Sequence, residues 1–148
     1  HMNKKIFIAS DHAGFELKNI IIEHLKKKEY LIEDIGPFTE DEVDYPIYAH
    51  TLSKRVLENQ QHIGILICGS GIGMSIAANK HKGVRASVCG DLKSARWTRE
   101  HNDANVLCMG ARIIDAELAK EITDIFLATD FIAGKHKTRV EMLEISQN

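Results

Sequence analysis

A cysteine stands where an apolar run meets a glycine-rich loop, in the segment ILICGSGIGMS at 65–75. The apolar run predicts a buried strand ending at Cys68, and the glycines predict a turn into a helix. Backbone amides that open a helix attract negative charge. The thiol could therefore act as a base or nucleophile beside a site for a developing oxyanion. A buried core thiol next to a tight turn explains the same residues equally well.

The glycine spacing does not fit the common phosphate-binding loops. A dinucleotide-binding fingerprint needs its third glycine at position 74, where Met74 stands. A P-loop closes on Gly-Lys-Ser or Gly-Lys-Thr, but the nearest lysine, Lys80, lies beyond a turn of the expected helix. A cysteine-dependent phosphatase would want an arginine where Met74 stands. The loop therefore suits a small oxyanion better than a nucleotide or a transferred phosphoryl group.

Further candidates for acid–base chemistry and phosphate binding lie in three other places. The segment SDHAG at 10–14 follows the first apolar run, and HNDAN at 101–105 precedes the last. A helix-capping aspartate, a surface histidine and a solvated loop would explain these segments one by one. A basic cluster could hold a phosphate monoester through charge-assisted contacts. Its members are Arg112, Lys135, His136, Lys137 and Arg139.

Five strand-and-helix units are expected to position these residues. The expected pairs are 5–9 with 15–28, 31–35 with 45–57, 63–68 with 71–79, 85–89 with 92–101, and 106–109 with 115–127, followed by a last helix at 138–145. Continuous apolar strands joined by helices predict an α/β, Rossmann-like three-layer fold. It has a five-stranded parallel sheet, helices on both faces and an extra C-terminal helix. Ligands collect at the carboxyl ends of such strands, so 10–12, 68–70 and the segment after Met109 should share one edge.

Composition indicates a single domain over 1–148, because 148 residues with 44% hydrophobic content suit one core. A net charge of −2 gives no indication of nucleic-acid or membrane binding. Three scattered cysteines lack the density of a disulfide scaffold and the pairing of a zinc site, which favours a cytoplasmic protein. No apolar run approaches the roughly 18 residues of a membrane span. His1, which precedes Met2, looks like a cloning remnant.

Together, the motifs resemble those of the B-type ribose-5-phosphate isomerase family, which also includes isomerases of galactose and allose 6-phosphates. The resemblance covers nearly the whole chain. It rests on SDHAG at 10–14, DYP at 44–46, ICGSGIG at 67–73, AANK at 77–80, HNDANV at 101–106, GAR at 110–112, and on His136 with RVE at 139–141. It implies an aldose–ketose isomerase of the pentose phosphate pathway, without metal or organic cofactor. Such an enzyme interconverts D-ribose 5-phosphate and D-ribulose 5-phosphate through an enediolate.

The resemblance also implies two catalytic residues. Cys68 would be the base, since the glutamate that serves other members at position 75 is replaced here by Ser75. A free thiol is mostly protonated near neutral pH, so the loop amides would have to favour the thiolate. His101 would protonate the ring oxygen and open the furanose, because only the open-chain sugar has an acidic proton next to its carbonyl.

The substrate-binding residues follow from the same match. They are Asp11, His12, Tyr45, Gly69, Ser70, Gly71, Ile72, Gly73, Asn102, Arg112, Lys135 and Arg139. The amides of 69–73 would hold the enediolate oxygens, and the three basic residues would bind the phosphate. Lys135 stands where family members often have arginine, so it keeps the charge but loses the bidentate geometry.

The family pattern further implies a homodimer or a pair of dimers with shared active sites. The 101–112 region and the basic C-terminal cluster would approach the Cys68 loop from different chains. Three alternatives remain open: an isomerase of a six-carbon sugar phosphate, a non-catalytic phosphate- or nucleotide-binding module of flavodoxin-like shape, and a thiol redox enzyme or phosphatase. Met74 and the lack of a nearby second cysteine disfavour the last of these.

Overall fold

The computed structural model describes residues 4–145, and within them five parallel strands form one sheet in the order β2-β1-β3-β5-β4. The strands are β1 (Lys5–Ser10), β2 (Leu31–Gly36), β3 (Ile63–Cys68), β4 (Ala86–Val88) and β5 (Val106–Gly110). The helices are α1 (Phe15–Lys27), α2 (Tyr45–Val56), α3 (Ile72–Ala78), α4 (Leu92–Glu100), α5 (Ala116–Ala128) and α6 (Lys135–Glu141). The predicted fold class is confirmed. No helix in this described part is both long and apolar enough to cross a membrane.

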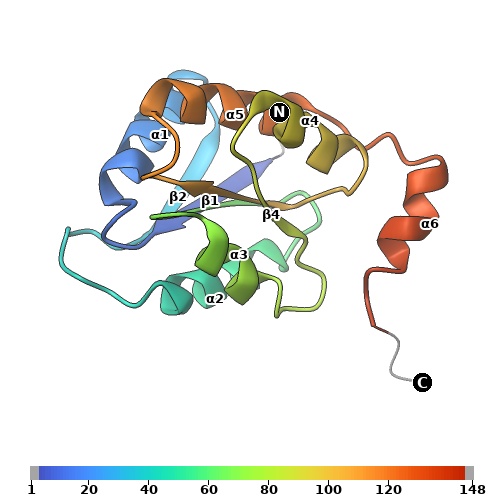
Figure 1. Cartoon of the computed structure of the whole chain (residues 1–148), viewed down its shortest axis with the longest axis horizontal. Helices are drawn as coiled ribbons and strands as arrows, with labels where there is room; N and C mark the ends of the chain where they lie inside the picture. The colour runs from blue at the N-terminus through green and yellow to red at the C-terminus, as the bar shows by residue number, and fades with distance from the viewer. Residues whose placement is uncertain (1–3, 146–148) are drawn as a thin grey trace.

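The sheet separates two apolar cores, as Figure 1 shows. Helices α1, α4 and α5 cover one face, and α2 and α3 cover the other. The central strand β3 is buried along its whole length because its side chains alternate between the two cores. Ile65 and Ile67 belong to the first core, whereas Leu66 and Cys68 belong to the second. The strand therefore delivers Cys68 on the α2–α3 side of the sheet.

The carboxyl ends of β1, β3 and β5 meet at one edge, as the sequence predicted. Ser10 pairs with Ile67, and Cys68 pairs with Gly110. The loops that follow these strands consequently lie together. The opposite, amino edge is distant, because the six residues of β3 span roughly 20 Å at about 3.3 Å per residue.

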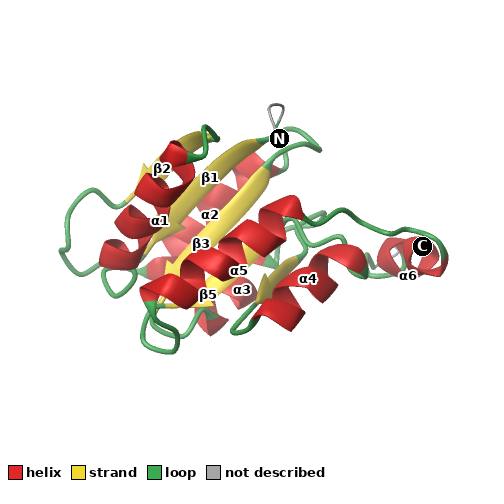
Figure 2. Ribbon diagram, turned by 90° about the horizontal axis from the view of Figure 1, so that it is seen from above, coloured by secondary structure: helices red, strands yellow, loops and turns green. Residues whose placement is uncertain are grey.

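The C-terminal helix is shifted from the predicted range of 138–145. It begins at Lys135, directly after Ala133 and Gly134, whose φ values of 63° and 51° turn the chain. Met142 and Leu143, two apolar residues inside the range expected for this helix, follow it and are 75% and 57% exposed. Figures 1 and 2 show α6 beyond α4, apart from the sheet and its helices. A helix with no buried residue gains little from its own chain and suits docking on another subunit.

Glu33 on β2 is expected to make the stability of the fold sensitive to acid. Its carboxylate accepts hydrogen bonds from Arg55 at 2.6 and 3.1 Å and lies 3.2 Å from Lys5. The hydrogen bonds from Arg55 lower the pKa of Glu33 in the folded chain. The stabilisation of the folded chain by these hydrogen bonds is therefore present above the unfolded pKa of about 4.3. It is lost as the pH falls through the pKa of Glu33 in the folded chain.

The measurement is the free energy of unfolding in urea from pH 6 to pH 3, for the unmutated chain and for Glu33→Gln. We expect the stability advantage of the unmutated chain to shrink as the pH falls. The effect should be small, because the carboxylate is 36% exposed. An advantage that stayed constant across this range would contradict the assignment.

Candidate active site

Cys68 is held at the carboxyl end of β3 beneath the glycine loop and is 5% exposed. The backbone N–H of Gly71 donates a hydrogen bond to its Sγ at 3.1 Å. Gly71 has a φ of 81°, and a Cβ there would lie 3.0 Å from the carbonyl carbon of Met109. A glycine is therefore needed for the loop to turn against β5. The turn aims an N–H donor at the sulfur of Cys68.

The loop beyond Cys68 is partly open to solvent. Gly69, Ser70 and Gly73 are half-buried, and Ile72 is 56% exposed. Ser70 Oγ accepts the N–H of Ile72 at 3.2 Å. Two of the five amides predicted to hold an enediolate thus donate within the loop in this structure, one to sulfur and one to the serine oxygen.

Asp11 and His12 lie beside this loop, as predicted. The N–H of Asp11 donates to the carbonyl of Ile67 at 3.1 Å, and its Oδ1 accepts the N–H of Gly14 at 3.0 Å. His12 Nδ1 accepts the N–H of Val43 at 3.2 Å. Because a backbone amide can only donate, the neutral His12 ring carries its hydrogen on Nε2. His12 is therefore prepared to donate Nε2–H to an anion.

Tyr45 and Arg112 complete the carboxyl-edge group. Tyr45 begins α2, and its ring lies over Gly73, where an added Cβ would be 2.6 Å from Tyr45 Cζ. The N–H of Arg112 donates to the carbonyl of Gly69 at 3.0 Å, and its Nη1 would lie 3.3 Å from a Cβ on Gly69. Arg112 thus belongs to the Cys68 loop of its own chain. The expectation that it approaches with the 101–112 region of another chain is wrong.

His101 and Asn102 lie at the opposite edge of the sheet. Helix α4 follows β4 and runs back toward the amino edge, where His101 caps its C-terminus. The chain then enters β5, and the carbonyl of Asn105 accepts the N–H of Gly64, the second residue of β3. Since β3 spans roughly 20 Å, His101 cannot reach the Cys68 of its own chain.

The His101 ring is stacked between two aromatic neighbours. Its centroid lies 6.1 Å from Trp97 and 4.5 Å from His136, with planes inclined by 21° and 17°. Desolvation, followed by the nearby charges of His101, Lys135 and Arg139, lowers the pKa of His136. The neutral form of His136 is thereby favoured. The stack brings the basic face of α6 to the side of the molecule that carries His101.

The predicted residues therefore fall into two groups within one chain. The carboxyl-edge half-site comprises Asp11, His12, Tyr45, Cys68, residues 69–73 and Arg112. The amino-edge half-site comprises His101, Asn102, Lys135 and Arg139.

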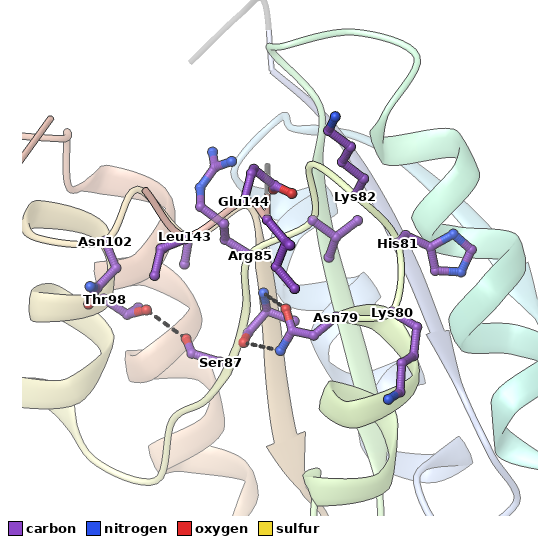
Figure 3. Close-up of a pocket in the computed structure, with 14 residues that line it drawn as sticks. Asn79, Lys80, His81, Lys82, Arg85, Ser87, Thr98, Asn102, Leu143 and Glu144 are labelled. Carbon is purple, nitrogen blue, oxygen red and sulfur yellow. Dashed lines mark hydrogen bonds between the residues drawn. The ribbon is translucent and has the colours of Figure 1, made fainter. Parts of the chain in front are cut away.

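A cleft of about 600 Å³ opens beside Asn102 (Figure 3). Asn102 and Thr98 lie on one side, and Lys80, His81 and Lys82 lie on the other. Of the described residues that line it, none comes from the carboxyl-edge half-site. Residues 4–145 also hold no group of three or more His, Cys, Asp or Glu side chains placed to bind a metal ion.

Comparison with known proteins decides the family. The sequence profile of the Ribose/Galactose Isomerase family matches residues 6–143. This chain belongs to the ribose/galactose isomerase family.

Several members are similar over nearly their full length. Ribose-5-phosphate isomerase B of Escherichia coli (strain K12) is 44% identical over 140 residues, which cover 95% of this chain and 94% of the relative. The structure of ribose-5-phosphate isomerase B from Mycoplasma genitalium with bound ribulose-5-phosphate superposes with a TM-score of 0.94 at 43% identity, covering 97% and 95% of the two chains. The Thermotoga maritima ribose 5-phosphate isomerase gives a TM-score of 0.92 at 47% identity, covering 95% of this chain and 97% of that one. The predicted family and isomerase class are confirmed.

Sequence reasoning missed one buried charge that supports the site of this family member. Lys18 is fully buried, and its Nζ donates to both carboxylate oxygens of Asp34, at 2.8 and 2.9 Å, and to the carbonyl of Pro37 at 2.6 Å. These bonds hold the start of the loop that continues to Val43 and Tyr45. A signal was present, because Lys18 shares a helical face with the buried residues Ile21, Ile22 and Leu25.

Two glycines of the site are expected to respond differently to alanine. A Cβ at Gly14 would lie 2.5 Å from the carbonyl oxygen of Ile67, which is backbone of the central strand. A Cβ at Gly73 would meet the ring of Tyr45, a half-exposed side chain that can swing away. We expect Gly14→Ala to destabilise the fold by about 1–3 kcal/mol in urea unfolding. Gly73→Ala should have a free energy of unfolding close to that of the unmutated chain but bind substrate more weakly. A larger loss of stability in Gly73→Ala than in Gly14→Ala would contradict this account.

Proposed function

We propose that this family member interconverts D-ribose 5-phosphate and D-ribulose 5-phosphate through an enediolate. The observation that carries the proposal is the N–H of Gly71 directed at Cys68 Sγ, 3.1 Å away, at the mouth of the central strand. Similarity to ribose-5-phosphate isomerases B, one of them with bound ribulose-5-phosphate, supports the choice of substrate. We propose further that the enzyme serves pentose phosphate metabolism in the cytoplasm.

The reaction moves one carbon-bound proton between neighbouring carbons. The Cys68 thiolate takes the proton from C2 of the open-chain aldose, and the same proton, or one from solvent, is delivered to C1. The hydroxyl proton moves from O2 to O1, so that the aldehyde becomes an alcohol and C2 becomes the ketone. The amides of 69–73 that do not donate to Cys68 Sγ or Ser70 Oγ stabilise the negative enediolate oxygens between these steps. Asp11, His12 and Tyr45 contact the sugar. The scheme uses no metal or organic cofactor.

Ring opening and phosphate binding require the second half-site. His101 protonates the ring oxygen of the furanose and Asn102 contacts the sugar near the reacting carbons. Because His101 lies at the amino edge of its own chain, we propose that it acts in the site of a second copy. The assembly is then a homodimer or a dimer of dimers. Arg112 from one chain and Lys135 and Arg139 from its partner surround the phosphate, and all three are exposed in a single chain.

A six-carbon sugar phosphate is the second candidate substrate, because the matched family also covers galactose isomerases. Allose or galactose 6-phosphate would use the same thiol and loop with a longer pocket. The two candidates differ only in substrate, so one assay compares them.

The test is the formation of ribulose 5-phosphate from ribose 5-phosphate by purified, chelator-treated protein in deuterium oxide. We expect turnover, with solvent deuterium entering C1 of the product to the extent that the Cys68 thiol exchanges its proton with solvent before delivery. Allose and galactose 6-phosphates run in parallel would identify a six-carbon enzyme. A protein that turned over none of them would support the binding-module interpretation instead.

A further inference from the structure

Two arginines hold Asp103, which follows His101 and Asn102 in the chain. Arg99 Nη1 donates to Asp103 Oδ1 at 3.2 Å, and Arg85 Nη2 donates to Oδ2 at 3.3 Å. Arg85 Nε also donates to the Asp103 carbonyl at 2.8 Å, and the Asp103 N–H donates to the carbonyl of Arg99 at 3.3 Å. We name this group the Arg85–Asp103–Arg99 clamp. Backbone and side chain of Asp103 are both bound.

Both arginines are themselves fixed to the body of the fold. Arg99 is 7% exposed, donates to the carbonyls of Ala104 and Thr129, and lies 5.6 Å from the centroid of the Phe126 ring. Arg85 is tied to the start of β5, because its N–H donates to Asn105 Oδ1 at 2.8 Å and its carbonyl accepts the N–H of Asn105 at 3.0 Å. Figure 3 shows Arg85 at the rim of the cleft that Asn102 lines. The clamp therefore connects the loop to rigid elements.

The backbone of Asp103 is unusual in a way that needs such support. Its φ is 49°, in the left-handed region that residues other than glycine rarely adopt. Aspartate tolerates this region better than most residues, but the conformation still persists only when its surroundings hold it. This left-handed residue turns the chain from the end of α4 toward β5. His101, the C-cap of α4, and Asn102 stand directly before that turn, so a change at Asp103 would alter the path of the chain beside them.

We propose that the Arg85–Asp103–Arg99 clamp is a positioning device that presents His101 to the Cys68 loop of a second copy of the chain. The inference rests on the proposed function, in which His101 opens the sugar ring. Asp103 touches no substrate and acts through His101. A side chain that acts in the site of another subunit is not positioned by that subunit before the two chains associate. Its own chain must therefore supply the alignment that catalysis needs, since a displacement of about 1 Å can lower the rate about 100-fold.

The experiment separates ring opening from proton transfer with the two natural substrates. Ribose 5-phosphate is largely a furanose and must be opened. Ribulose 5-phosphate cannot close that ring, because the hydroxyl it would need carries the phosphate. Exchange of its C1 hydrogen with deuterium oxide therefore reports the Cys68 step alone. Both rates are measured for the unmutated enzyme, His101→Ala, Asp103→Asn and the double variant, after circular dichroism has confirmed folding.

Asp103→Asn places an amide nitrogen against one of two guanidinium groups and should release the loop. We expect kcat for ribose 5-phosphate to fall about 10- to 100-fold, while C1 exchange in ribulose 5-phosphate changes far less. His101→Ala should show the same pattern. Adding Asp103→Asn to His101→Ala should cause no further loss of kcat for ribose 5-phosphate. Glu33→Gln is the matched control, because Glu33 also lies between two cations and is 36% exposed, against 35% for Asp103. It should change neither rate.

The outcomes distinguish the clamp from the function on which it rests. If His101→Ala keeps its turnover of ribose 5-phosphate, the proposed role of His101 fails. If His101→Ala loses that turnover and Asp103→Asn does not, or if the two losses multiply, the clamp proposal is overturned. Should Asp103→Asn fail to fold, Arg85→Lys replaces it, because lysine keeps the charge and cannot make the two hydrogen bonds of Arg85 to Asp103 together.

Discussion

Replacing Cys68 with alanine should lower kcat for ribose 5-phosphate by about 100- to 10,000-fold, the contribution usual for a positioned general base. The substitution removes only the sulfur, and the remaining Cβ keeps its place in the α2–α3 core. Ser75 lies on the following helix and its Oγ donates to the carbonyl of Ile72. A serine hydroxyl is far too weak an acid to take over as an anionic base. No neighbouring loop residue therefore substitutes for the thiolate.

Cys89→Ala is the control for this experiment. Cys89 is 1% exposed, but it belongs to the core on the other face of the sheet. Burial raises the pKa of its thiol, so Cys89 is held in the protonated form. We expect Cys89→Ala to retain the kcat of the unmutated enzyme when the two are compared at equal concentrations of folded protein. Full activity in Cys68→Ala would make Cys68 a core thiol and end the proposed mechanism.

The carboxyl-edge half-site could be predicted because its position follows from local rules. Continuous apolar runs identify strands buried on both faces, and parallel strands bring their carboxyl ends to one edge. Cys68 and the loop after Ser10 were placed together on this ground alone, and the register of β1, β3 and β5 agrees. The glycine at position 71 also helped the prediction, because its positive φ directs its N–H at the sulfur of Cys68.

The remaining features depend on long-range contacts that no local pattern encodes. The range of α6 was missed because Met142 and Leu143 look like core anchors in sequence, although nothing in their own chain buries them. Arg112 was placed with His101 because both lie near β5, but a strand separates the two residues and carries them to opposite edges. The contacts that hold Asp103 join this loop residue to Arg99 on α4 and to Arg85, which precedes β4. Such a group becomes visible only in three dimensions.

The separation of the half-sites predicts the outcome of mixing two inactive variants. Cys68→Ala and His101→Ala chains, coexpressed or refolded together, should recover about a quarter of the unmutated specific activity. Random pairing of two chains makes half of the dimers mixed, and each mixed dimer has one of its two sites intact. That site takes Cys68 from one chain and His101 from the other. A site built within a single chain would recover nothing, because each chain would still lack one of the two groups.

The matched control mixes Cys68→Ala with Arg112→Ala, two variants of the same half-site. Arg112 lies against Gly69 of its own chain, so a mixed dimer has one site without the base and another without a phosphate ligand. We expect no recovery above the two variants measured separately. Recovery in this control together with none in the first mixture would mean that Arg112, and not His101, crosses between chains. Because the same edge of the sheet holds Arg112 and Cys68, the structure predicts the reverse.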